Sequence, residues 1–316
     1  MKILVTPTSF LNPQNAQAKA TLENFASTVV YNDLARPLTA EEVIERLDDV
    51  DGYIAGLDHI TADVIRKAPE KLKVISRYGI GVDRVDLEEC KKRGIVVTNT
   101  PGTNSVAVCE LAFALMLCAA RNIPRLHQAV ENGLWPRSEG IELNGKVLGI
   151  VGLGAIGKLL ALRARAFGMK IVACDSCFDH SYARLHDIAP LEFEALLEQS
   201  DFISLHVPLN AETKRMIDVK AIERMKTGAF LINTARGGLI NEQAIAEGIR
   251  SGKLGGVGLD AFEEEPLLDS PLKGLDRVVF TPHSGAHTSD AVRSMGRMAV
   301  ENLMTVLRGE TSPYRV

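Results

Sequence analysis

The segment VLGIVGLGAIG, from Val147 to Gly157, decides the fold. Its first five residues are mostly apolar, as in a buried strand, and the glycine-rich turn after them leads directly into a helical pattern. Gly152 allows the tight turn, Gly154 lets backbone N–H groups approach a pyrophosphate, and Gly157 lets the helix pack close to the strand. This strand-turn-helix context predicts a dinucleotide-binding unit.

An acidic residue stands at the distance that such a unit requires. Asp175 ends the second predicted strand, 175 − 157 = 18 residues after the last glycine of the turn. Its carboxylate can accept hydrogen bonds from ribose hydroxyls and would repel a 2′-phosphate, so we expect NAD rather than NADP. A second glycine-rich turn, Gly79-Ile80-Gly81, has no following long helix with such an acid and is a candidate anion site.

From Lys146 onward, apolar runs alternate with helical patterns, which predicts a doubly wound parallel sheet. Six strands are expected, at 147–151, 171–174, 202–207, 229–233, 256–260 and 278–281. Helices are expected at about 156–167, 191–199, 219–225 and 242–251, with Gly168 and Gly252 as C-terminal stops.

The first hundred residues repeat this pattern more weakly and predict a second α/β unit. Its strands are expected at 3–6, 53–55, 74–76 and 95–98. A helix beginning near Asn104 leads into the larger domain, and a last helix covers about 289–308. The apolar run from Val106 to Ala120 contains Glu110 and is shorter than the ~20 residues that span a bilayer, so it predicts a buried helix.

Composition narrows the class of protein. The 316 residues carry 36 Lys and Arg against 40 Asp and Glu, with no basic stripe, so nucleic acid is not an expected partner. The N-terminal apolar run is too short for a signal peptide, so no membrane association and a cytoplasmic location are expected. Cys174 and Cys177 form the one suggestive cysteine pair, but no ligand pattern accompanies them, and neither a disulfide framework nor a metal site is expected.

Three residues whose side chains can transfer a proton or bind an anion follow the last three predicted strands. Arg236, Glu265 and His283 stand after the fourth, fifth and sixth strands, and ligands of open parallel sheets bind at the carboxyl ends of the strands. A histidine is suited to proton transfer near neutral pH, and a carboxylate on its other ring nitrogen would fix the tautomer. An arginine fork pairs with a substrate carboxylate. The three residues predict an acid/base catalyst, its supporting carboxylate and a substrate anchor.

These features lead to a family resemblance. From about Asp51 to Arg308 the chain resembles the D-isomer-specific 2-hydroxyacid dehydrogenases, most closely the phosphoglycerate dehydrogenase branch. Besides the glycine-rich turn, the matching motifs are RYGIGVD at 77–83, NTPGTN at 99–104, HVPL at 206–209, TARGG at 234–238, DAFEEEP at 260–266, and Pro282-His283.

The resemblance implies two Rossmann-like domains: a six-stranded NAD-binding domain at 100–285, inserted into a smaller flavodoxin-like substrate domain made of 1–99 and 286–316. It implies catalytic roles for Arg236, Glu265 and His283, and a substrate carboxylate near Arg77, Tyr78, Gly79 and Ile80, with Arg236. The NAD contacts it implies are Gly152, Gly154, Ala155, Ile156, Gly157, Asp175, His206, Val207, Pro208, Thr213, Thr234, Ala235, Arg236, Asp260, His283 and Gly285. It also implies a homodimer, with a tetramer as the alternative.

Two departures from the family pattern bear on the substrate. Phosphoglycerate dehydrogenases often have an arginine in the turn that corresponds to Ala55–His59, whereas this turn holds Asp58. A phosphorylated substrate is therefore not expected unless Arg77 or His59 supplies the charge. The sequence ends at Val316, so the C-terminal regulatory domains of many serine-pathway enzymes, and control by serine through them, are not expected.

The sequence as a whole predicts an NAD-dependent oxidoreductase that moves hydride between the cofactor and C2 of a small 2-hydroxy or 2-keto acid. Oxidation of D-3-phosphoglycerate and reduction of glyoxylate or hydroxypyruvate are the alternatives within the class. The same fold and residues also occur in NAD-sensing corepressor-like binding proteins. A methyltransferase on a related fold is disfavoured because it would not use the three rim residues.

Overall fold

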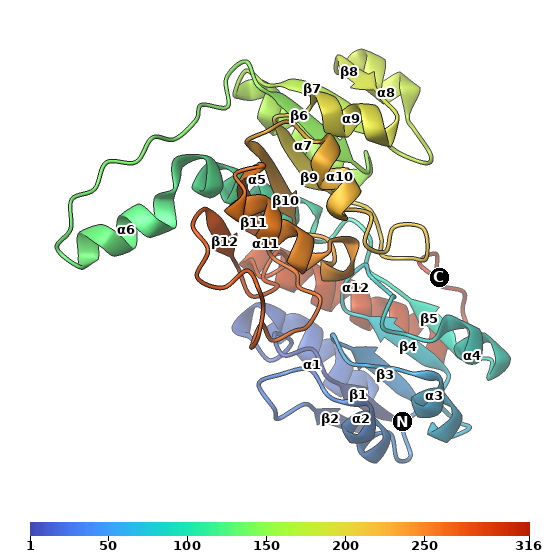
Figure 1. Cartoon of the computed structure of the whole chain (residues 1–316). Coiled ribbons are helices and arrows are strands. Elements are labelled where there is room, and N and C mark those ends of the chain that lie inside the picture. The colour runs from blue at the N-terminus through green and yellow to red at the C-terminus, as the bar shows by residue number, and fades with distance from the viewer. The chain divides into compact units, whose positions relative to one another are not determined.

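The computed structural model describes residues 1–316 and separates into two compact units. One consists of Met1–Asn104 together with Ala286–Val316, and the other is the continuous segment Ser105–Gly285. The second unit is therefore an insertion in the chain of the first. Figure 1 shows that each unit has a sheet of its own with helices around it. The predicted α/β class with parallel sheets is confirmed.

The inserted unit contains seven strands in the order β12-β11-β10-β9-β6-β7-β8, all paired in parallel. They are β6 (Val147–Val151), β7 (Lys170–Cys174), β8 (Ile188–Pro190), β9 (Phe202–Leu205), β10 (Ala229–Asn233), β11 (Leu254–Leu259) and β12 (Val278–Phe280). The prediction of six strands is wrong by one, because β8 has only three residues, two of them exposed, and ends in a proline. So short a strand carries no periodicity for a sequence pattern to reveal.

Helices cover both faces of this sheet, as the apolar runs of the strands require. The first core cluster contains residues of α5 (Ser105–Arg121) and α7 (Ala155–Ala166), and the second contains residues of the helices on the opposite face. Those opposite helices are α9 (Phe193–Gln199), α10 (Val219–Arg224) and α11 (Glu242–Arg250), and the unit also contains α8 (His180–Leu185) and the short helix η2 (Gly237–Leu239).

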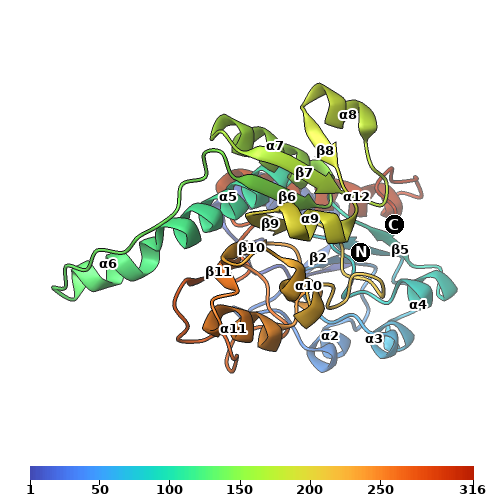
Figure 2. The same cartoon turned by 45° about the horizontal axis from the view of Figure 1, so that its top comes forward.

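The predicted buried helix is α5, ten of whose 17 residues are buried. It is followed by α6 (Ile123–Glu131), none of whose residues is buried, and Figure 2 shows α6 and the segment after it extending away from the sheet of their own unit. No single helix is long and apolar enough to cross a membrane, and α5 with α6 satisfy that criterion only as a pair bent by 64°.

The first unit has a five-stranded parallel sheet in the flavodoxin-like order β2-β1-β3-β4-β5. Its strands are β1 (Lys2–Val5), β2 (Thr28–Tyr31), β3 (Gly52–Ala55), β4 (Val74–Arg77) and β5 (Val96–Thr98). Strand β2 was not among those expected from the sequence. Helix α12 (Ser289–Leu307), the predicted last helix, packs on β3 and β4 and against α1 (Ala16–Phe25). The remaining helices are η1 (Pro13–Asn15), α2 (Ala40–Arg46), α3 (Ala62–Lys67) and α4 (Leu87–Lys92).

One buried carboxylate organises the carboxyl edge of this smaller sheet. Asp58 is 1% exposed and accepts hydrogen bonds from the Tyr53 hydroxyl at 2.9 Å, the Gly56 N–H at 3.0 Å and the Leu38 N–H at 2.7 Å. The Thr6 hydroxyl is its fourth donor. These four donors come from β3, from the turn after it, and from the segments that follow β1 and β2. The acid of the Ala55–His59 turn therefore points into the protein and does not face a ligand.

Replacement of Asp58 should destabilise this unit strongly. Asp58→Ala leaves several buried donors without an acceptor, so we expect the free energy of unfolding to fall by about 3 kcal/mol. Urea unfolding followed by circular dichroism measures this change. Asp63→Asn, on an exposed side chain paired with Lys67, is the matched control and should change stability by less than about 0.5 kcal/mol. Similar values for the two variants would contradict the role given to Asp58.

Candidate active site

The carboxyl edge of the seven-stranded sheet carries the candidate site. Because β6 and β9–β12 run parallel, the segments that follow them leave the sheet at one edge. The glycine-rich turn follows β6, His206 follows β9, Arg236 follows β10, Glu265 follows β11 and His283 follows β12. The sequence prediction that Arg236, Glu265 and His283 follow strands ending at one rim thus agrees with the strand order.

The glycine-rich turn has no room for side chains at two of its three glycines. Gly152 has a φ of +96°, and a Cβ there would lie 2.5 Å from the carbonyl oxygen of His206. A Cβ on Gly157 would lie 2.2 Å from the carbonyl oxygen of Gly152, so the approach of α7 to the turn requires glycine at this position. A Cβ on Gly154 would meet nothing within 4 Å. The N-terminus of α7 at Gly154 is therefore open to a bound anion.

Backbone N–H groups occupy part of the hydrogen-bonding capacity of the Asp175 carboxylate. The carboxylate accepts hydrogen bonds from the Leu153 N–H at 2.7 Å and from the Cys177 N–H at 2.8 Å. These bonds join the glycine-rich turn to the segment after β7. A carboxylate has about four acceptor positions, so two remain for ribose hydroxyls. The arrangement fits NAD, and the added negative charge of a 2′-phosphate would be unfavourable beside Asp175.

Two buried polar atoms at this edge have no partner in the chain: His206 Nδ1 and Thr234 Oγ1. The other ring nitrogen of His206 lies 2.8 Å from Ser204 Oγ. Burial lowers the pKa of His206 to about 4, so the imidazole is neutral at pH 7. Buried polar atoms almost always have partners, and these two follow adjacent strands, β9 and β10. The protein itself covers both atoms, so neither is exposed to a ligand in this arrangement, and their predicted contacts with NAD stay predictions.

Hydrogen bonds within the loop after β9 hold that part of the site in place. The Thr213 hydroxyl donates to the carbonyl oxygen of Pro208 at 2.7 Å and accepts from the Asn210 N–H at 2.9 Å, which closes the loop that follows β9. Val207 lies at the start of this loop and packs on the second core cluster. Predicted contacts of Val207, Pro208 and Thr213 with NAD stay predictions, as do those of Ala155 and Ile156 in the first turn of α7.

Asp260 fixes the loop that carries the candidate histidine. It is 1% exposed. One carboxylate oxygen accepts from the Thr281 hydroxyl at 2.6 Å and the Ser284 N–H at 2.8 Å, and the other accepts from the Gly285 N–H at 2.8 Å. These three bonds bracket His283. Asp260 thus orients this loop, whereas its predicted contact with NAD stays a prediction, as does that of Gly285.

His283 and Glu265 lie in contact. His283 Nδ1 is 2.8 Å from Glu265 Oε1, and the two side chains are 23% and 16% exposed. Glu265 Oε1 also accepts from the Phe262 N–H at 3.3 Å. A carboxylate on Nδ1 fixes the proton on that nitrogen and leaves Nε2 for a substrate. His283 has a φ of +50°, a region that non-glycine residues occupy rarely and often at functional sites.

Arg236 lies on a turn that is held by the side chain of Asn233, a residue that was not predicted from the sequence. The side chain of Asn233 is buried, accepts from the Ala235 N–H at 3.0 Å and donates to the Arg236 carbonyl oxygen at 2.8 Å. Its position at the end of β10, three residues before the arginine, was the available signal. The next residue, Gly237, lies so close to Phe262 that a Cβ would be 1.8 Å from its carbonyl carbon. The turns bearing Arg236 and Glu265 are therefore packed together.

The predicted substrate residues of the first unit differ in accessibility. Arg77 is 3% exposed, and its guanidinium donates to the carbonyl oxygens of Ala55, Gly56 and Gly81. Tyr78 is also buried. Gly79 has a φ of +137°, and its N–H donates to Thr100 Oγ1 at 3.0 Å.

Ile80, by contrast, is 45% exposed, and its N–H makes no hydrogen bond within the chain. The Ile80 N–H is therefore available to a carboxylate, and the Gly81 N–H, which also makes no hydrogen bond within the chain, lies beside it. Among the residues considered as partners of a phosphate, Arg77 is buried and His59 is exposed. Substrate binding by Arg77, Tyr78, Gly79 and Ile80 stays a prediction.

A parallel sheet with a glycine-rich βα turn, an acid after its second strand and a histidine–glutamate pair at its carboxyl edge is typical of NAD-dependent oxidoreductases. Residues 113–285 match the model of the D-isomer-specific 2-hydroxyacid dehydrogenase NAD-binding domain. The chain belongs to this family, whose members are NAD-dependent oxidoreductases acting on the CH–OH group of 2-hydroxy acids. The resemblance seen in the sequence is confirmed.

Individual relatives agree with the family but differ in substrate. The chain is 42% identical to D-3-phosphoglycerate dehydrogenase of Methanocaldococcus jannaschii, over 98% of this chain and 58% of that one. It is 40% identical to glyoxylate reductase of Thermococcus litoralis, over 93% and 92% of the two chains. A structure of D-lactate dehydrogenase from Aquifex aeolicus complexed with NAD and lactic acid has a TM-score of 0.86 and 28% identity, covering 98% of this chain and 96% of that one.

The Asp175 carboxylate should discriminate between the two nicotinamide cofactors. In Asp175→Ala we expect the KM for NADH to rise about tenfold, because charge-assisted bonds to the ribose are lost. The KM for NADPH should rise less or fall, since the repulsion of the 2′-phosphate is removed as well. Steady-state kinetics with both cofactors measures the two values, with Glu194→Ala on α9 as the control. An equal rise for NADH and NADPH would show that Asp175 acts only through the backbone bonds it accepts.

Proposed function

We propose that this protein is a dehydrogenase of small D-2-hydroxy acids, with Arg236, Glu265 and His283 as its catalytic residues. The contact between His283 Nδ1 and Glu265 Oε1 carries the proposal, because it prepares a histidine for proton transfer at the sheet edge where ligands bind. The packed turns of Arg236 and Glu265 support it. Oxidation of 3-phosphoglycerate and reduction of glyoxylate or hydroxypyruvate, which relatives are named for, lie within this proposal.

The two units receive separate roles in this proposal. The inserted unit, Ser105–Gly285, binds NAD, as the family match to residues 113–285 supports. The other unit supplies the turn after β4, where the Ile80 N–H has no partner in the chain, as a further donor to the substrate carboxylate besides Arg236. We also propose a cytoplasmic location, which the five free cysteines support because secreted proteins commonly pair theirs.

The mechanism follows from the positions of the side chains. When NAD(H) is bound, it supplies or accepts the hydride that is exchanged with C2 of the substrate. His283 donates a proton from Nε2 to the C2 oxygen during reduction and takes it back during oxidation. Glu265 holds Nδ1–H and stabilises the protonated ring. Arg236 binds the substrate carboxylate and polarises the adjacent carbonyl. The neutral His206 leaves His283 as the proton carrier.

Substitutions of the three residues should affect turnover in different ways. His283→Ala should lower kcat/KM for 2-keto acids about 10³-fold through loss of proton transfer. Glu265→Gln keeps the shape but not the charge and should lower kcat more than it changes KM. Arg236→Lys loses the planar fork and should raise the KM of the keto acid about tenfold. NADH oxidation with glyoxylate, hydroxypyruvate and pyruvate measures these values.

All three variants should still bind NADH, which fluorescence titration tests, and His180→Ala on α8 is the control for a general effect of losing a histidine. Turnover by His283→Ala within tenfold of the wild type would overturn the catalytic assignment. A wild-type protein that binds NADH and reduces no 2-keto acid would overturn the proposed activity.

We further propose that the protein is a homodimer joined through α6 and the segment that follows it. We call residues 123–140, which comprise α6 and the segment after it, the arm. Residues 131–140 are all exposed, and the arm carries four exposed apolar side chains: Ile123, Val130, Leu134 and Trp135, which are 47%, 51%, 61% and 82% exposed. A nine-residue helix with no buried residue is not stable in water by itself. A second copy, related by twofold symmetry, can cover two such arms at once.

The apolar residues of the arm should control the oligomeric state. Trp135→Glu combined with Val130→Asp places charges on the proposed interface, so we expect the mass from light scattering to fall from two chains to one. Leu185→Glu, on an equally exposed leucine of α8 outside the arm, should leave the mass at two chains. A wild-type protein with the mass of one chain would contradict this interface.

A further inference from the structure

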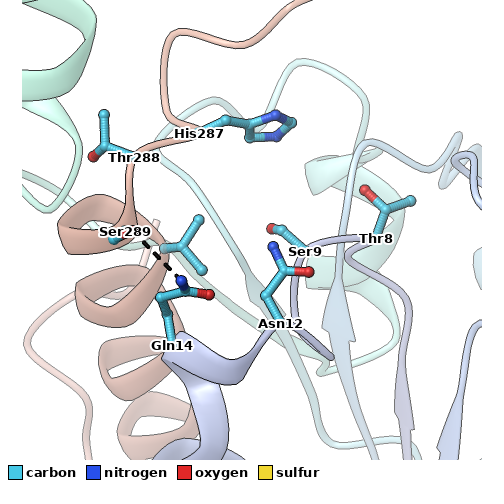
Figure 3. A pocket seen from close by; sticks show the side chains of 8 residues that line it. Thr8, Ser9, Asn12, Gln14, His287, Thr288 and Ser289 are labelled. Atoms are coloured by element: carbon cyan, nitrogen blue, oxygen red, sulfur yellow. Dashed lines mark hydrogen bonds between the residues drawn. The ribbon is translucent and has the colours of Figure 1, made fainter.

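A cavity of about 350 Å³ opens within the first unit, beside the carboxyl end of β1. Two segments line it, and they lie far apart in sequence. One is the connection from β1 to α1, and the other is the start of α12 with the residues before it. Figure 3 shows the side chains of the two segments around a common space, with a hydrogen bond of 3.5 Å from Gln14 Nε2 to Ser289 Oγ joining them. The lining residues are Thr8, Ser9, Asn12, Gln14, His287, Thr288, Ser289 and Val292.

The chemistry of the lining is polar without a permanent charge. Val292 is the one apolar residue of the eight, and no lysine, arginine or carboxylate takes part. Hydroxyl, amide and imidazole groups provide both donors and acceptors. The Asn12 side chain is exposed and makes no hydrogen bond within the chain, so its amide is available to a ligand. Such a lining suits a neutral, hydroxylated group, and a phosphate would find no guanidinium or ammonium group here.

One side chain connects this cavity with the turn proposed to bind the substrate carboxylate. Tyr78 directly precedes Gly79, and its hydroxyl donates to the carbonyl oxygen of Val292 at 2.9 Å. The same hydroxyl lies 3.5 Å from Ser9 Oγ. Ser9 and Val292 both line the cavity. The side chain of Tyr78 therefore connects the wall of the cavity with the turn at Gly79 and Ile80, within the same unit.

The covalent chain also ties the cavity to the proposed proton donor. His287 follows His283 by four residues. Four extended residues span at most ~14 Å, whatever path the chain takes. The Cα atoms of the proposed acid/base and of this cavity residue are therefore at most ~14 Å apart.

On the basis of the proposed dehydrogenase function, we propose that this cavity receives the part of the substrate beyond C2. The substrate class is then a 2-keto acid, or the matching 2-hydroxy acid, that carries hydroxyl groups from C3 onward and no phosphate. A volume of 350 Å³ is about twelve times the ~30 Å³ that one water occupies in the liquid, so several hydroxylated carbons fit. Asn12 and Gln14 are the specificity-determining residues.

Matched substrate pairs test this proposal on the wild-type protein. Reduction by NADH is measured with hydroxypyruvate against pyruvate and with 4-hydroxy-2-ketobutyrate against 2-ketobutyrate, the members of each pair differing in one hydroxyl group. We expect kcat/KM to be at least tenfold higher for the hydroxylated member of each pair. Phosphohydroxypyruvate should be a poorer substrate than hydroxypyruvate. Calorimetry with His283→Ala and NADH provides the same comparison as dissociation constants.

Two nearly isosteric variants locate the preference in the cavity. Asn12→Leu and Gln14→Met replace amides by apolar groups of similar size, and each should reduce the hydroxylated-to-unsubstituted ratio of kcat/KM about fivefold, the effect of one lost hydrogen bond. Gln243→Met, on α11 in the other unit, is the matched control and should keep the wild-type ratio.

The outcomes separate this proposal from the function on which it rests. Reduction of both members of each pair with equal kcat/KM, a ratio unchanged in both variants, or a preference for phosphohydroxypyruvate overturns the role of the cavity and leaves the dehydrogenase function intact. Failure of every 2-keto acid to react although NADH binds overturns the dehydrogenase function and this proposal together.

Discussion

The hydrogen bonds of Asp260 are the interaction on which the candidate site depends most. This buried carboxylate directly follows β11 and binds Thr281, Ser284 and Gly285 of the loop that follows β12. It therefore fixes His283 relative to the neighbouring strand end, which leads into Glu265. The contact of 2.8 Å between His283 and Glu265 needs both loops to be held to within a few tenths of an ångström. A buried charge with several donors can supply that restraint, whereas apolar packing alone would not define direction.

In the first unit too, a buried aspartate accepts hydrogen bonds from several loops. Asp58 is buried at the carboxyl edge of the five-stranded sheet and collects donors from segments after β1, β2 and β3. Loops at such an edge lack the regular hydrogen bonds of the sheet, so their backbone groups need other partners. One carboxylate with four acceptor positions meets that need for several loops at once. In both units, a buried aspartate at the carboxyl edge of the sheet supports the loops around it.

The sequence predicted the long elements and the rim because their signals are local. Apolar runs such as Val147–Val151 and the glycines of the turn have direct structural counterparts in β6 and the start of α7. Strands β2 and β8 were missed because they are short and partly exposed, so their place depends on pairing with distant strands. The direction in which a side chain points could not be predicted from the sequence either. Arg77 and Asp58 have the residue types of a phosphate site and of a repelling charge, yet both are buried against the backbone.

The segment from His283 to His287 joins the proposed chemistry to the proposed specificity. Gly285 ends the inserted unit and Ala286 resumes the first, so this short stretch carries the acid/base at one end and a cavity residue at the other. Asp260 restrains its beginning, and the Thr288 side chain, which accepts from the Ala291 N–H, caps α12 just beyond its end. Four residues cannot extend beyond ~14 Å, so the covalent chain itself limits the distance between the Cα atoms of His283 and His287. The proposed proton transfer and the proposed substrate selection are thus assigned to two ends of one short segment.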